Sequence, residues 1–575
     1  MDSKYEASFK NICKANAAIW QKCMELSMQS LESKVSIVSK DIEDLNNFFS
    51  NNVNKLQHEL FLGQIKLNEY YKLRFLNLNP VEIYPAKVKD NRFKGAEWQE
   101  NIFFNYIKQS YLLLHDVILK VLKEDEAPQK YKDRLRFTIN FLFHAHAPSN
   151  FLITNPEIIK KTIETSGANL VQGYANFIRD IQVSNKYLNI QNSNQTSFEL
   201  GKDLAITKGK VIYKNDLFEL IEYYPVNGEE HEIPLLIVPP CINKYYILDL
   251  QEKNSLVLWY LKQGYKIYLV SWSNPEFGSA FSLDSYITSG IITALNIIKD
   301  ISAVKKVNLL GYCIGGTLSL CAAALLRKKG ESFINSVILL TALADFSDVG
   351  DIAYFINENN IDSICDYMKQ NGGFSGEDMS MIFNSLKPSE TIWNNYINSY
   401  FLGKELSSFD ILFWNADTTR LSSEMHEKYL KEFYINNKFV KEGIVIDGVL
   451  INIDDLKEDF YIVATIEDHI VPWRSVFNGL SKLANKQNIE FTLGDSGHVA
   501  GIINSPDSLK YCYWKNPNTL GITADKWFED AIKMPGSWWV DLNKWLANKS
   551  GIKVNSSVSK LKEITNAPGS YVLRK

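Results

Sequence analysis

The run 307–317, Val-Asn-Leu-Leu-Gly-Tyr-Cys-Ile-Gly-Gly-Thr, constrains the fold of this chain more than any other feature. A short β-prone run ends inside it, and residues 318–326 then read as a helix. Between the two, Gly311 and Gly315 flank Cys313 in the pattern Gly-x-Cys-x-Gly. A nucleophile on a tight strand-to-helix turn needs small residues two positions before and two positions after it. The run therefore predicts a nucleophile elbow, with cysteine where serine is usual.

Such a turn would lift the Cys313 sulfur above a sheet, at the N-terminus of the following helix. That position favours the thiolate, which is the reactive form of cysteine. A buried cysteine at a helix start is the alternative that this pattern leaves open, because five-residue patterns recur by chance. Cys321 falls about two turns further along the same helix, so we expect it in the core.

Composition limits the classes of protein that this chain can belong to. Its 575 residues, 46% of them hydrophobic, are enough for two domains. With 62 basic and 66 acidic residues the net charge is −4, and no basic tract indicates nucleic acid. Residues 1–6 do not begin a signal peptide, and no run of 18 apolar residues predicts a transmembrane segment. The seven scattered cysteines, without a Cys-x-x-Cys pair, fit a reducing cytoplasm and neither disulfides nor zinc.

Residues 1–205 are mostly helical in pattern and predict an N-terminal domain for interactions with partners. Two of its histidines, His144 and His146, are expected to be packed or bonded to solvent. Its first helix carries a regular apolar series, with steps of 3 and 4 after Met28 as in a coiled-coil seam: Trp20, Met24, Met28, Leu31, Val35, Val38, Ile42, Leu45 and Phe49. This helix could pack on its own domain, or it could pair with another chain or lie on an apolar surface.

Residues 206–575 alternate β-rich and helical runs, which predicts a parallel sheet covered on both faces. Besides the run that ends at the elbow, strands are expected at 234–238, 266–272, 336–340, 460–465 and 489–493, and a helix at 286–301. The alternation fails between about 345 and 454, where aromatic residues and asparagine are frequent, Trp393 and Trp414 among them. A lid is often inserted at this place in such sheets, so we expect a cap over Cys313 that excludes water.

A cysteine nucleophile needs a base, and the base needs an acid that orients it. His498 lies in a glycine-rich loop after the strand at 489–493, and Asp468 follows the strand at 460–465. Loops after strands are where catalytic side chains are presented. The chain order Cys313, Asp468, His498 is the order of nucleophile, acid and histidine in α/β-hydrolase sheets.

Other assignments stay open on the sequence. His469 could be the base, although it adjoins Asp468 and neighbours on a loop rarely point at one partner. Asp345 or Asp348 could be the acid, because both also follow a strand. Asp495 lies three residues before the candidate base, and we expect it to shape the turn.

Two backbone N–H groups are expected to stabilise the tetrahedral oxyanion. The first belongs to Ile314, directly after the nucleophile. The second usually comes from the loop after an early strand, here Pro-Pro-Cys-Ile at 239–242, so Ile242 is the expected donor. Cys241 in this loop is expected to contribute through its backbone, not its thiol.

The chain resembles the polyhydroxyalkanoate synthases, and within them the class I poly(3-hydroxybutyrate) polymerases. The likeness runs from about residue 80 to the C-terminus, whereas residues 1–75 match only in helical character. It rests on the elbow and on long motifs: Val-Pro-Pro-Cys-Ile-Asn-Lys-Tyr-Tyr-Ile-Leu-Asp at 238–249, Glu-Asp-His-Ile-Val-Pro-Trp at 467–473, Ser-Gly-His-Val-Ala at 496–500, Arg-Phe-Lys-Gly-Ala-Glu-Trp at 92–98, Pro-Ser-Asn-Phe-Leu-Ile-Thr-Asn-Pro at 148–156 and Pro-Gly-Ser-Trp-Trp at 535–539.

The resemblance implies a cytoplasmic bacterial enzyme that polymerises (R)-3-hydroxyacyl-CoA, chiefly 3-hydroxybutyryl-CoA, into polyester granules and releases CoA. It implies Cys313 as the acylated nucleophile, His498 as general base and Asp468 as its support. It further implies an α/β-hydrolase domain with a mobile cap behind a helical N-terminal domain, a homodimer, and granule proteins called phasins as partners. CoA thioester is the substrate and CoA the product, so neither a cofactor nor a metal is expected.

Two other functions remain possible from the sequence. One is a cysteine-nucleophile esterase or thioesterase on the same fold, because the sheet and the three side chains alone do not exclude it. The other is a non-catalytic granule-binding protein that uses its helical half, although an intact Cys-Asp-His set argues against it.

Overall fold

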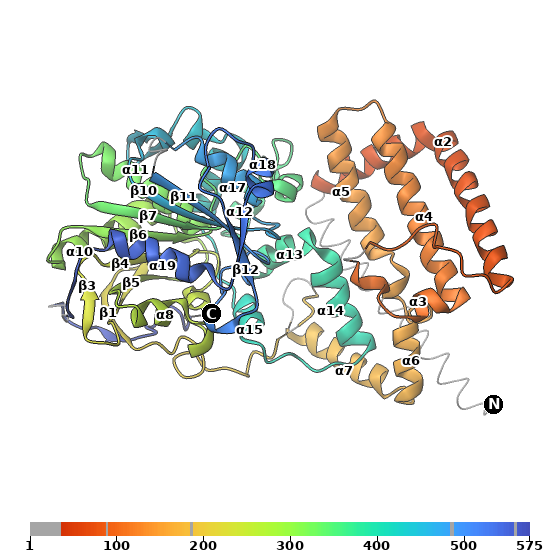
Figure 1. Cartoon of the computed structure of the whole chain (residues 1–575), viewed down its shortest axis with the longest axis horizontal. Helices are drawn as coiled ribbons and strands as arrows, with labels where there is room; N and C mark the ends of the chain where they lie inside the picture. The colour runs from red at the N-terminus through yellow and green to blue at the C-terminus, as the bar shows by residue number, and fades with distance from the viewer. Residues whose placement is uncertain are drawn as a thin grey trace. The chain divides into compact units, whose positions relative to one another are not determined.

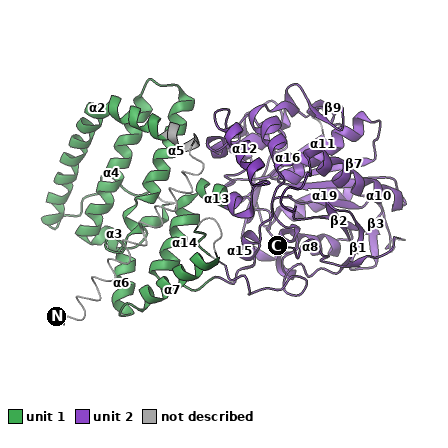
Figure 2. Ribbon diagram, turned by 180° about the vertical axis from the view of Figure 1, so that it is seen from behind, with its two compact units in different colours: residues 1–192, 381–406 green, residues 193–380, 407–575 purple. Residues whose placement is uncertain are grey.

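The computed structural model describes residues 36–87, 90–183, 188–191, 193–483, 488–556 and 561–574. These residues fall into two compact units (Figure 2). Unit 1 comprises residues 1–192 and 381–406, and unit 2 comprises residues 193–380 and 407–575. The N-terminal part of the predicted seam, from Trp20 to Val35, lies outside the described residues.

Unit 1 is built from helices (Figure 1), and three of them share a buried apolar cluster. Its longer helices are α2 (Ser36–Phe75), α4 (Ile102–Glu124), α5 (Gln129–Ala145), α6 (Pro156–Glu164) and α7 (Ala168–Val183). The side chain of Asn101 caps α4 by accepting a hydrogen bond from the N–H of Phe103 at 2.9 Å. Leu67 of α2, Val121 of α4 and Leu135 of α5 are fully buried together, so these three helices share one core.

Helix α2 continues well beyond the predicted end of the seam at Phe49. Of the seam residues whose side chains are described, Leu45 is buried, whereas Ile42 and Phe49 are 50% and 37% exposed. The buried face instead passes through Phe48, Leu56 and Leu67. The described part of the seam therefore does not coincide with the buried face of α2.

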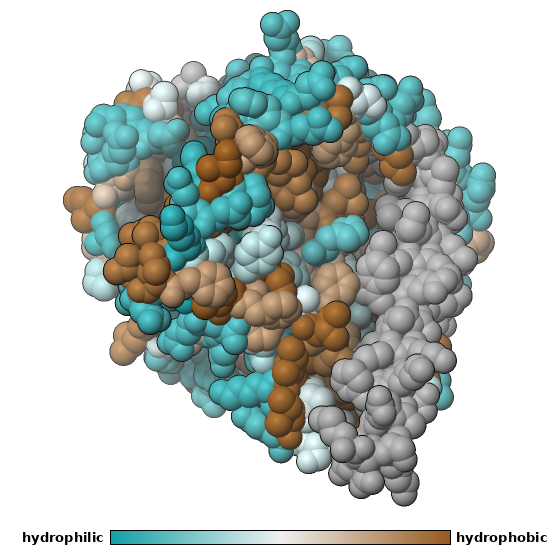
Figure 3. All heavy atoms as spheres, turned by 90° about the vertical axis from the view of Figure 1, so that its right-hand side faces the viewer, coloured by the Kyte–Doolittle hydropathy of each residue, from teal (hydrophilic) through white to brown (hydrophobic). Residues whose placement is uncertain are grey.

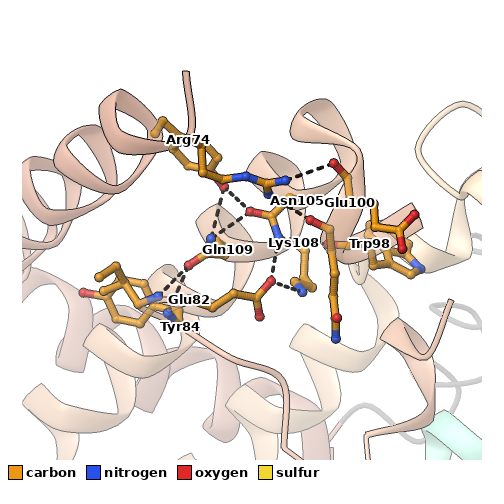
Figure 4. A network of polar contacts seen from close by, with 11 residues as sticks. Arg74, Glu82, Tyr84, Trp98, Glu100, Asn105, Lys108 and Gln109 are labelled. Atoms are coloured by element: carbon orange, nitrogen blue, oxygen red, sulfur yellow. Dashed lines mark hydrogen bonds and ion pairs between the residues drawn. The ribbon is translucent and has the colours of Figure 1, made fainter. Parts of the chain in front are cut away.

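A buried polar network ties the segment before α4 to the middle of that helix (Figure 4). The ammonium of Lys108, 1% exposed, lies 2.6 Å from a carboxylate oxygen of Glu82. The amide of Asn105 also donates to Glu82, at 2.6 Å. The side-chain oxygen of Gln109 accepts from the N–H groups of Ile83 and Tyr84 at 3.0 and 3.1 Å. Every buried polar group named here therefore has a partner, as burial requires.

Beside this network, apolar side chains remain exposed on α2 and α4. Phe75 is 72% exposed and Phe103 is 58% exposed, and both line a shallow apolar pocket with Tyr106. Figure 3 shows a face of the molecule on which apolar side chains gather among hydrophilic ones. Within the described residues, no helix carries an apolar stretch long enough to cross a bilayer.

Residues 381–406 lie inside the range 345–454 that the sequence suggested for the cap, yet they belong to unit 1. The side-chain amides of Asn169 and Asn176 on α7 donate to the backbone oxygens of Phe401 and Ser399 at 2.7 and 3.0 Å. Phe177 of α7 is buried in one cluster with Tyr396, Tyr400, Phe401 and Leu402, and Trp393 packs against that cluster. Of the two tryptophans expected in the cap, only Trp414 therefore belongs to unit 2.

Unit 2 contains an eleven-stranded sheet in the order β13-β12-β11-β10-β7-β6-β4-β5-β2-β1-β15. The six central strands, β11 to β5 in that order, run parallel, and the flanking strands are antiparallel. Their bounds are β1 Gly209–Lys214, β2 Phe218–Tyr223, β4 Leu235–Val238, β5 Ile267–Trp272, β6 Val307–Tyr312, β7 Ile334–Leu340, β10 Asp459–Thr465, β11 Ile489–Gly494, β12 Cys512–Lys515, β13 Ile532–Pro535 and β15 Thr565–Asn566. Short pairs, β3 (Glu229–His231) with β14 (Lys553–Asn555) and β8 (Ile444–Ile446) with β9 (Val449–Ile451), lie outside this sheet.

Both faces of the parallel region are buried. On β6, Leu310 and Tyr312 join the core formed with α8 (Leu256–Lys262) and α19 (Trp538–Lys549), which lie against the sheet in Figure 1. Leu309, which alternation places on the opposite face, is equally buried. The other helices of unit 2 include α10 Thr293–Ile301, α11 Ile314–Lys328, α12 Ile361–Gln370, α15 Asp410–Ala416, α16 Ser423–Tyr429, α17 Trp473–Leu480 and α18 Ala524–Glu529. The predicted α/β architecture behind a helical N-terminal region is confirmed.

The six strands expected from the sequence correspond to the six parallel strands. The helix expected at 286–301 forms in two parts, a π-helical segment, η5 (Tyr286–Ile292), followed directly by α10. The antiparallel flanks β1, β2, β12, β13 and β15 were not expected.

Candidate active site

The elbow has the conformation that its sequence predicts. Strand β6 ends at Tyr312, helix α11 begins at Ile314, and Cys313 between them has φ 53° and ψ −129°. A non-glycine residue with positive φ is uncommon, and such outliers cluster at functional sites. The N–H of Cys313 donates to the backbone oxygen of Leu340 on β7 at 2.9 Å, which fixes the turn to the sheet.

The two flanking glycines allow close packing. A Cβ at Gly311 would lie 2.4 Å from the Cα of Gly316. A Cβ at Gly315 would lie 2.4 Å from the backbone oxygen of Val238 and 2.7 Å from that of Pro239. The first turn of α11 thus touches the end of β4 directly, and only glycine fits between them.

His498 and Asp468 form a buried pair. The imidazole Nδ1 of His498, in the loop after β11, lies 2.6 Å from Oδ2 of Asp468, in the loop after β10. The side chains are 8% and 0% exposed. The other carboxylate oxygen of Asp468 accepts from the N–H groups of Ile470 and Val471 at 2.9 and 2.8 Å. These two bonds hold the carboxylate so that it can fix the orientation of the imidazole.

Electrostatics favour a protonated imidazole. Burial by itself would lower the pKa of His498, but the charges of Asp468 and Cys313, and hydrogen bonds with both side chains, raise that pKa well above its usual value. Cys313 is thus close enough to His498 for its charge to affect the pKa of the imidazole.

Tyr312 supports His498 in a way that the sequence reasoning missed. Its hydroxyl donates to the backbone oxygen of His498 at 3.2 Å, and the two rings stack with centroids 5.6 Å apart. The sequence held one indication of this position. Side chains alternate along a strand, which places Tyr312 on the opposite face of the sheet from Gly311.

The structure also shows where the alternative candidates lie. Asp345 accepts a hydrogen bond from the amide of Asn437 at 2.7 Å, and Asp348 accepts one from the N–H of Gly350 at 3.0 Å. Asp495 accepts from its neighbour's N–H and from the thiol of Cys512, so it does shape the turn. The carboxylate that His498 contacts is that of Asp468.

The two histidines considered in the N-terminal half, His144 and His146, take different positions. Burial lowers the pKa of His144 to about 4, which indicates a packed neutral ring. His146 is exposed, and its Nδ1 lies 2.9 Å from the backbone oxygen of Leu142.

The two expected oxyanion donors lie on adjoining elements. Ile314 is the first residue of α11, where a backbone N–H has no acceptor within the helix. Ile242 follows β4, whose last residue Val238 pairs with Gly311 of β6. The loop that carries Ile242 therefore begins next to the elbow. Cys241 is fully buried, and burial raises the pKa of its thiol, so it is a poor nucleophile.

Within the described residues, no cluster of three or more His, Cys, Asp or Glu side chains could hold a metal ion. The five cysteines among the described residues are free thiols. Cys321 lies on α11 and is fully buried, as expected.

The fold and this arrangement define a protein of the α/β-hydrolase class. Residues 234–505 match the family model of the alpha/beta hydrolase fold, and residues 89–260 match that of the poly-beta-hydroxybutyrate polymerase (PhaC) N-terminus. The chain is 37% identical to a poly(3-hydroxyalkanoate) polymerase subunit of Rhizobium etli over 86% of this chain and 78% of that protein. It is also 37% identical to the poly(3-hydroxyalkanoate) polymerase subunit of Cupriavidus necator, over 84% of this chain and 83% of that protein. The identity to the poly(3-hydroxyalkanoate) polymerase of Methylorubrum extorquens is likewise 37%, over 84% of this chain and 81% of that protein. The chain belongs to the poly(3-hydroxyalkanoate) polymerase family, and thereby to the acyltransferases.

Proposed function

We propose that the chain polymerises (R)-3-hydroxyacyl-CoA into polyhydroxyalkanoate and releases CoA, with Cys313 as nucleophile, His498 as general base and Asp468 as the orienting acid. The observation that carries the proposal is the buried 2.6 Å contact between His498 and Asp468 beside a cysteine held at positive φ on the elbow. Family membership supports the class of polymer.

The first half-reaction loads the enzyme. The Cys313 thiolate attacks the thioester carbonyl, and the resulting oxyanion is stabilised by the N–H groups of Ile314 and Ile242. The carbon–sulfur bond to CoA then breaks, and the CoA thiolate takes its proton from the imidazolium of His498. One thioester replaces another, so the acyl group keeps its activation. One oxyanion donor is typically worth about 3–4 kcal/mol.

The second half-reaction extends the chain. His498, now neutral, removes the proton from an incoming 3-hydroxyl group as its oxygen attacks the acyl carbonyl. A new ester bond forms, and the departing Cys313 sulfur recovers its thiolate form beside the reprotonated imidazole. General-base assistance of this kind contributes roughly 10²–10⁴-fold.

Water must be excluded, because it would compete with the hydroxyl group and hydrolyse the acyl enzyme. Burial raises the pKa of the Tyr429 and Tyr434 phenols, and the nearby Cys313 raises both further, after the effect of Tyr434 on Tyr429. Trp414 is 4% exposed in the same unit. We assign the aromatic part of the cap that lies in unit 2 to this exclusion.

The same proposal covers the surroundings of the reaction. Short acyl groups, chiefly 3-hydroxybutyryl, are the expected substrates, and no cofactor is required. The enzyme would act as a homodimer in the cytoplasm at the surface of polyester granules, with phasin-type proteins as neighbours, and the helical N-terminal domain would serve these interactions.

Mass spectrometry of the intact protein after brief exposure to 3-hydroxybutyryl-CoA tests the proposal, with released CoA followed in parallel. We expect a ladder of hydroxybutyryl additions on the wild type and on Cys512→Ala, which removes a half-buried thiol elsewhere, and none on Cys313→Ala. CoA release with free 3-hydroxybutyrate and no ladder would favour the cysteine hydrolase. No release of CoA at all would favour the non-catalytic granule-binding protein.

A further inference from the structure

A segment of the cap is tied to the loop after β4, which carries the expected oxyanion donor Ile242. The indole N–H of Trp414 donates to the backbone oxygen of Lys244 at 2.7 Å. The hydroxyl of Thr419 donates to the backbone oxygen of Cys241 at 3.1 Å. An isolated antiparallel bridge joins Asn243 and Thr418. These contacts lie on both sides of Ile242 along the loop.

An ion pair lies within this contact. The ammonium of Lys244 lies 2.8 Å from one carboxylate oxygen of Asp417, and their side chains are 4% and 14% exposed. The hydroxyl of Tyr246 donates to the other oxygen at 2.9 Å. Both oxygens of the carboxylate are thus used by the loop. Burying a lysine is costly unless it is paired, so this loop conformation depends on Asp417.

The remainder of the loop is anchored without the cap. The indole of Trp272 donates to the backbone oxygen of Pro239 at 2.9 Å, at the start of the loop. At its end, the fully buried carboxylate of Asp249 accepts from the hydroxyls of Thr207 and Ser255. Between these anchors, the middle of the loop is bonded to Asp417 and its neighbours, which come from a segment about 170 residues later in the chain. Outside the cap, the hydroxyl of Tyr245 donates to the backbone oxygen of Pro568 at the longer distance of 3.4 Å.

We propose that the Lys244–Asp417 ion pair is a positioning contact, which holds the backbone N–H of Ile242 in place to stabilise the oxyanion beside Cys313. The inference rests on the proposed function, because it assigns a step in the same reaction. Neither charged side chain touches the reacting atoms. Their effect passes through the backbone of the loop, so the oxyanion donor is in place only while the cap segment 414–419 is docked.

Two single variants and one double variant test the pair in the full-length enzyme. Asp417→Asn keeps the size of the side chain but removes its charge, and Lys244→Arg keeps the charge. The double variant Lys244→Met/Asp417→Asn removes both charges, so it leaves no unpaired ammonium and guards against loss of folding. Glu458→Gln serves as the matched control: Glu458 is 3% exposed and pairs with Arg327 at 2.6 Å, beside the start of β10 at the opposite end of the strands from Cys313.

Two rates are measured for each variant. The first is single-turnover CoA release from 3-hydroxybutyryl-CoA, which passes through an oxyanion. The second is alkylation of Cys313 by iodoacetamide, which forms no oxyanion. A misplacement of about 1 Å can cost roughly 10²-fold in rate. We expect Asp417→Asn and the double variant to release CoA roughly 10–10²-fold more slowly, with alkylation little changed, and Lys244→Arg and Glu458→Gln to resemble the wild type.

Unchanged CoA release in the double variant would overturn the inference. So would a parallel fall in alkylation, since that would mean that the pair supports the cysteine or the fold in general. If the wild type itself released no CoA, the proposed substrate would be wrong. The same variants would then be compared in the hydrolysis of p-nitrophenyl butyrate. This reaction at Cys313 also forms an oxyanion, so it would decide the inference.

Discussion

Replacement of Gly315 by alanine tests the close contact between the elbow and the end of β4. The added Cβ would fall short of ordinary van der Waals contact, which begins at 3.4 Å, by 1.0 Å at the backbone oxygen of Val238 and by 0.7 Å at that of Pro239. Both obstacles are backbone atoms, so no side chain can rotate away. The first turn of α11 and the start of the loop must therefore separate by roughly 1 Å.

The expected cost differs between stability and activity. Overpacking of this kind costs roughly 1–3 kcal/mol, and alanine regains about 1 kcal/mol over glycine inside a helix. The melting temperature should therefore fall by only a few degrees. The separation also moves Ile242 relative to Cys313, and a misplacement of about 1 Å can cost roughly 10²-fold in rate. We expect kcat to fall about 10²-fold in a folded enzyme.

The assay pairs thermal unfolding with the rate of CoA release from 3-hydroxybutyryl-CoA. Gly479→Ala in α17 is the matched control, because a Cβ there would meet its nearest neighbour, a side-chain atom of Asp345, at 3.5 Å. This control should keep full activity and unfold at the same or a slightly higher temperature. Activity of Gly315→Ala within threefold of the wild type would refute the argument that this contact sets the position of the oxyanion donor.

Three further predictions follow from other buried groups. Asp468→Asn should lower kcat by roughly 10²–10⁴-fold with the fold intact, and near-normal turnover would show that His498 does not need this carboxylate. Glu82→Gln leaves the 1% exposed ammonium of Lys108 without its counter-charge, so urea unfolding of unit 1 should show a loss of roughly 3 kcal/mol; an unchanged midpoint would contradict this. Burial lowers the pKa of His426 from 6.5 to about 4. As the pH falls from 7 to 5, the unfolded chain therefore gains a proton that the folded chain does not, and stability falls by about 2 kcal/mol. His426→Phe should lose most of this pH dependence, and an equal dependence in both proteins would count against it.

The parallel strands and the candidate site could be predicted from the sequence because their signals are local. Each of the three side chains follows directly after an apolar run, and the ends of parallel strands meet at one edge of a sheet. The elbow adds a steric requirement that Gly311 and Gly315 satisfy within five residues.

The antiparallel flanking strands could not be predicted from the sequence, for physical reasons. Strand β2 carries Glu219 and Glu222, which look like surface residues but are fully buried. Their partners are distant in sequence: the N–H of Tyr571 donates to Glu219 at 3.0 Å, and the hydroxyl of Tyr268 donates to Glu222 at 2.9 Å. Strand β13 is exposed at all four positions, so it has no apolar alternation to detect.

Contacts between distant segments could likewise not be predicted from the sequence. The pairing of Lys244 with Asp417 joins residues that no local pattern relates. The same holds for residues 381–406, whose aromatic side chains suggested a cap over Cys313 but complete the core of unit 1.

The assignment of residues 381–406 to unit 1 bears on how the protein is made on the ribosome. The cluster shared by α2, α4 and α5 has its last buried member at Ile139, with Phe143 packed against it, so it can form early in synthesis. The cluster around Phe177 needs Tyr396 to Leu402 and cannot close until these residues have emerged. At about 5–20 residues per second, the interval after residue 192 is roughly 10–40 s. During that time the apolar side of α7 lacks its cover, and a fragment that ends before residue 381 would keep it exposed permanently.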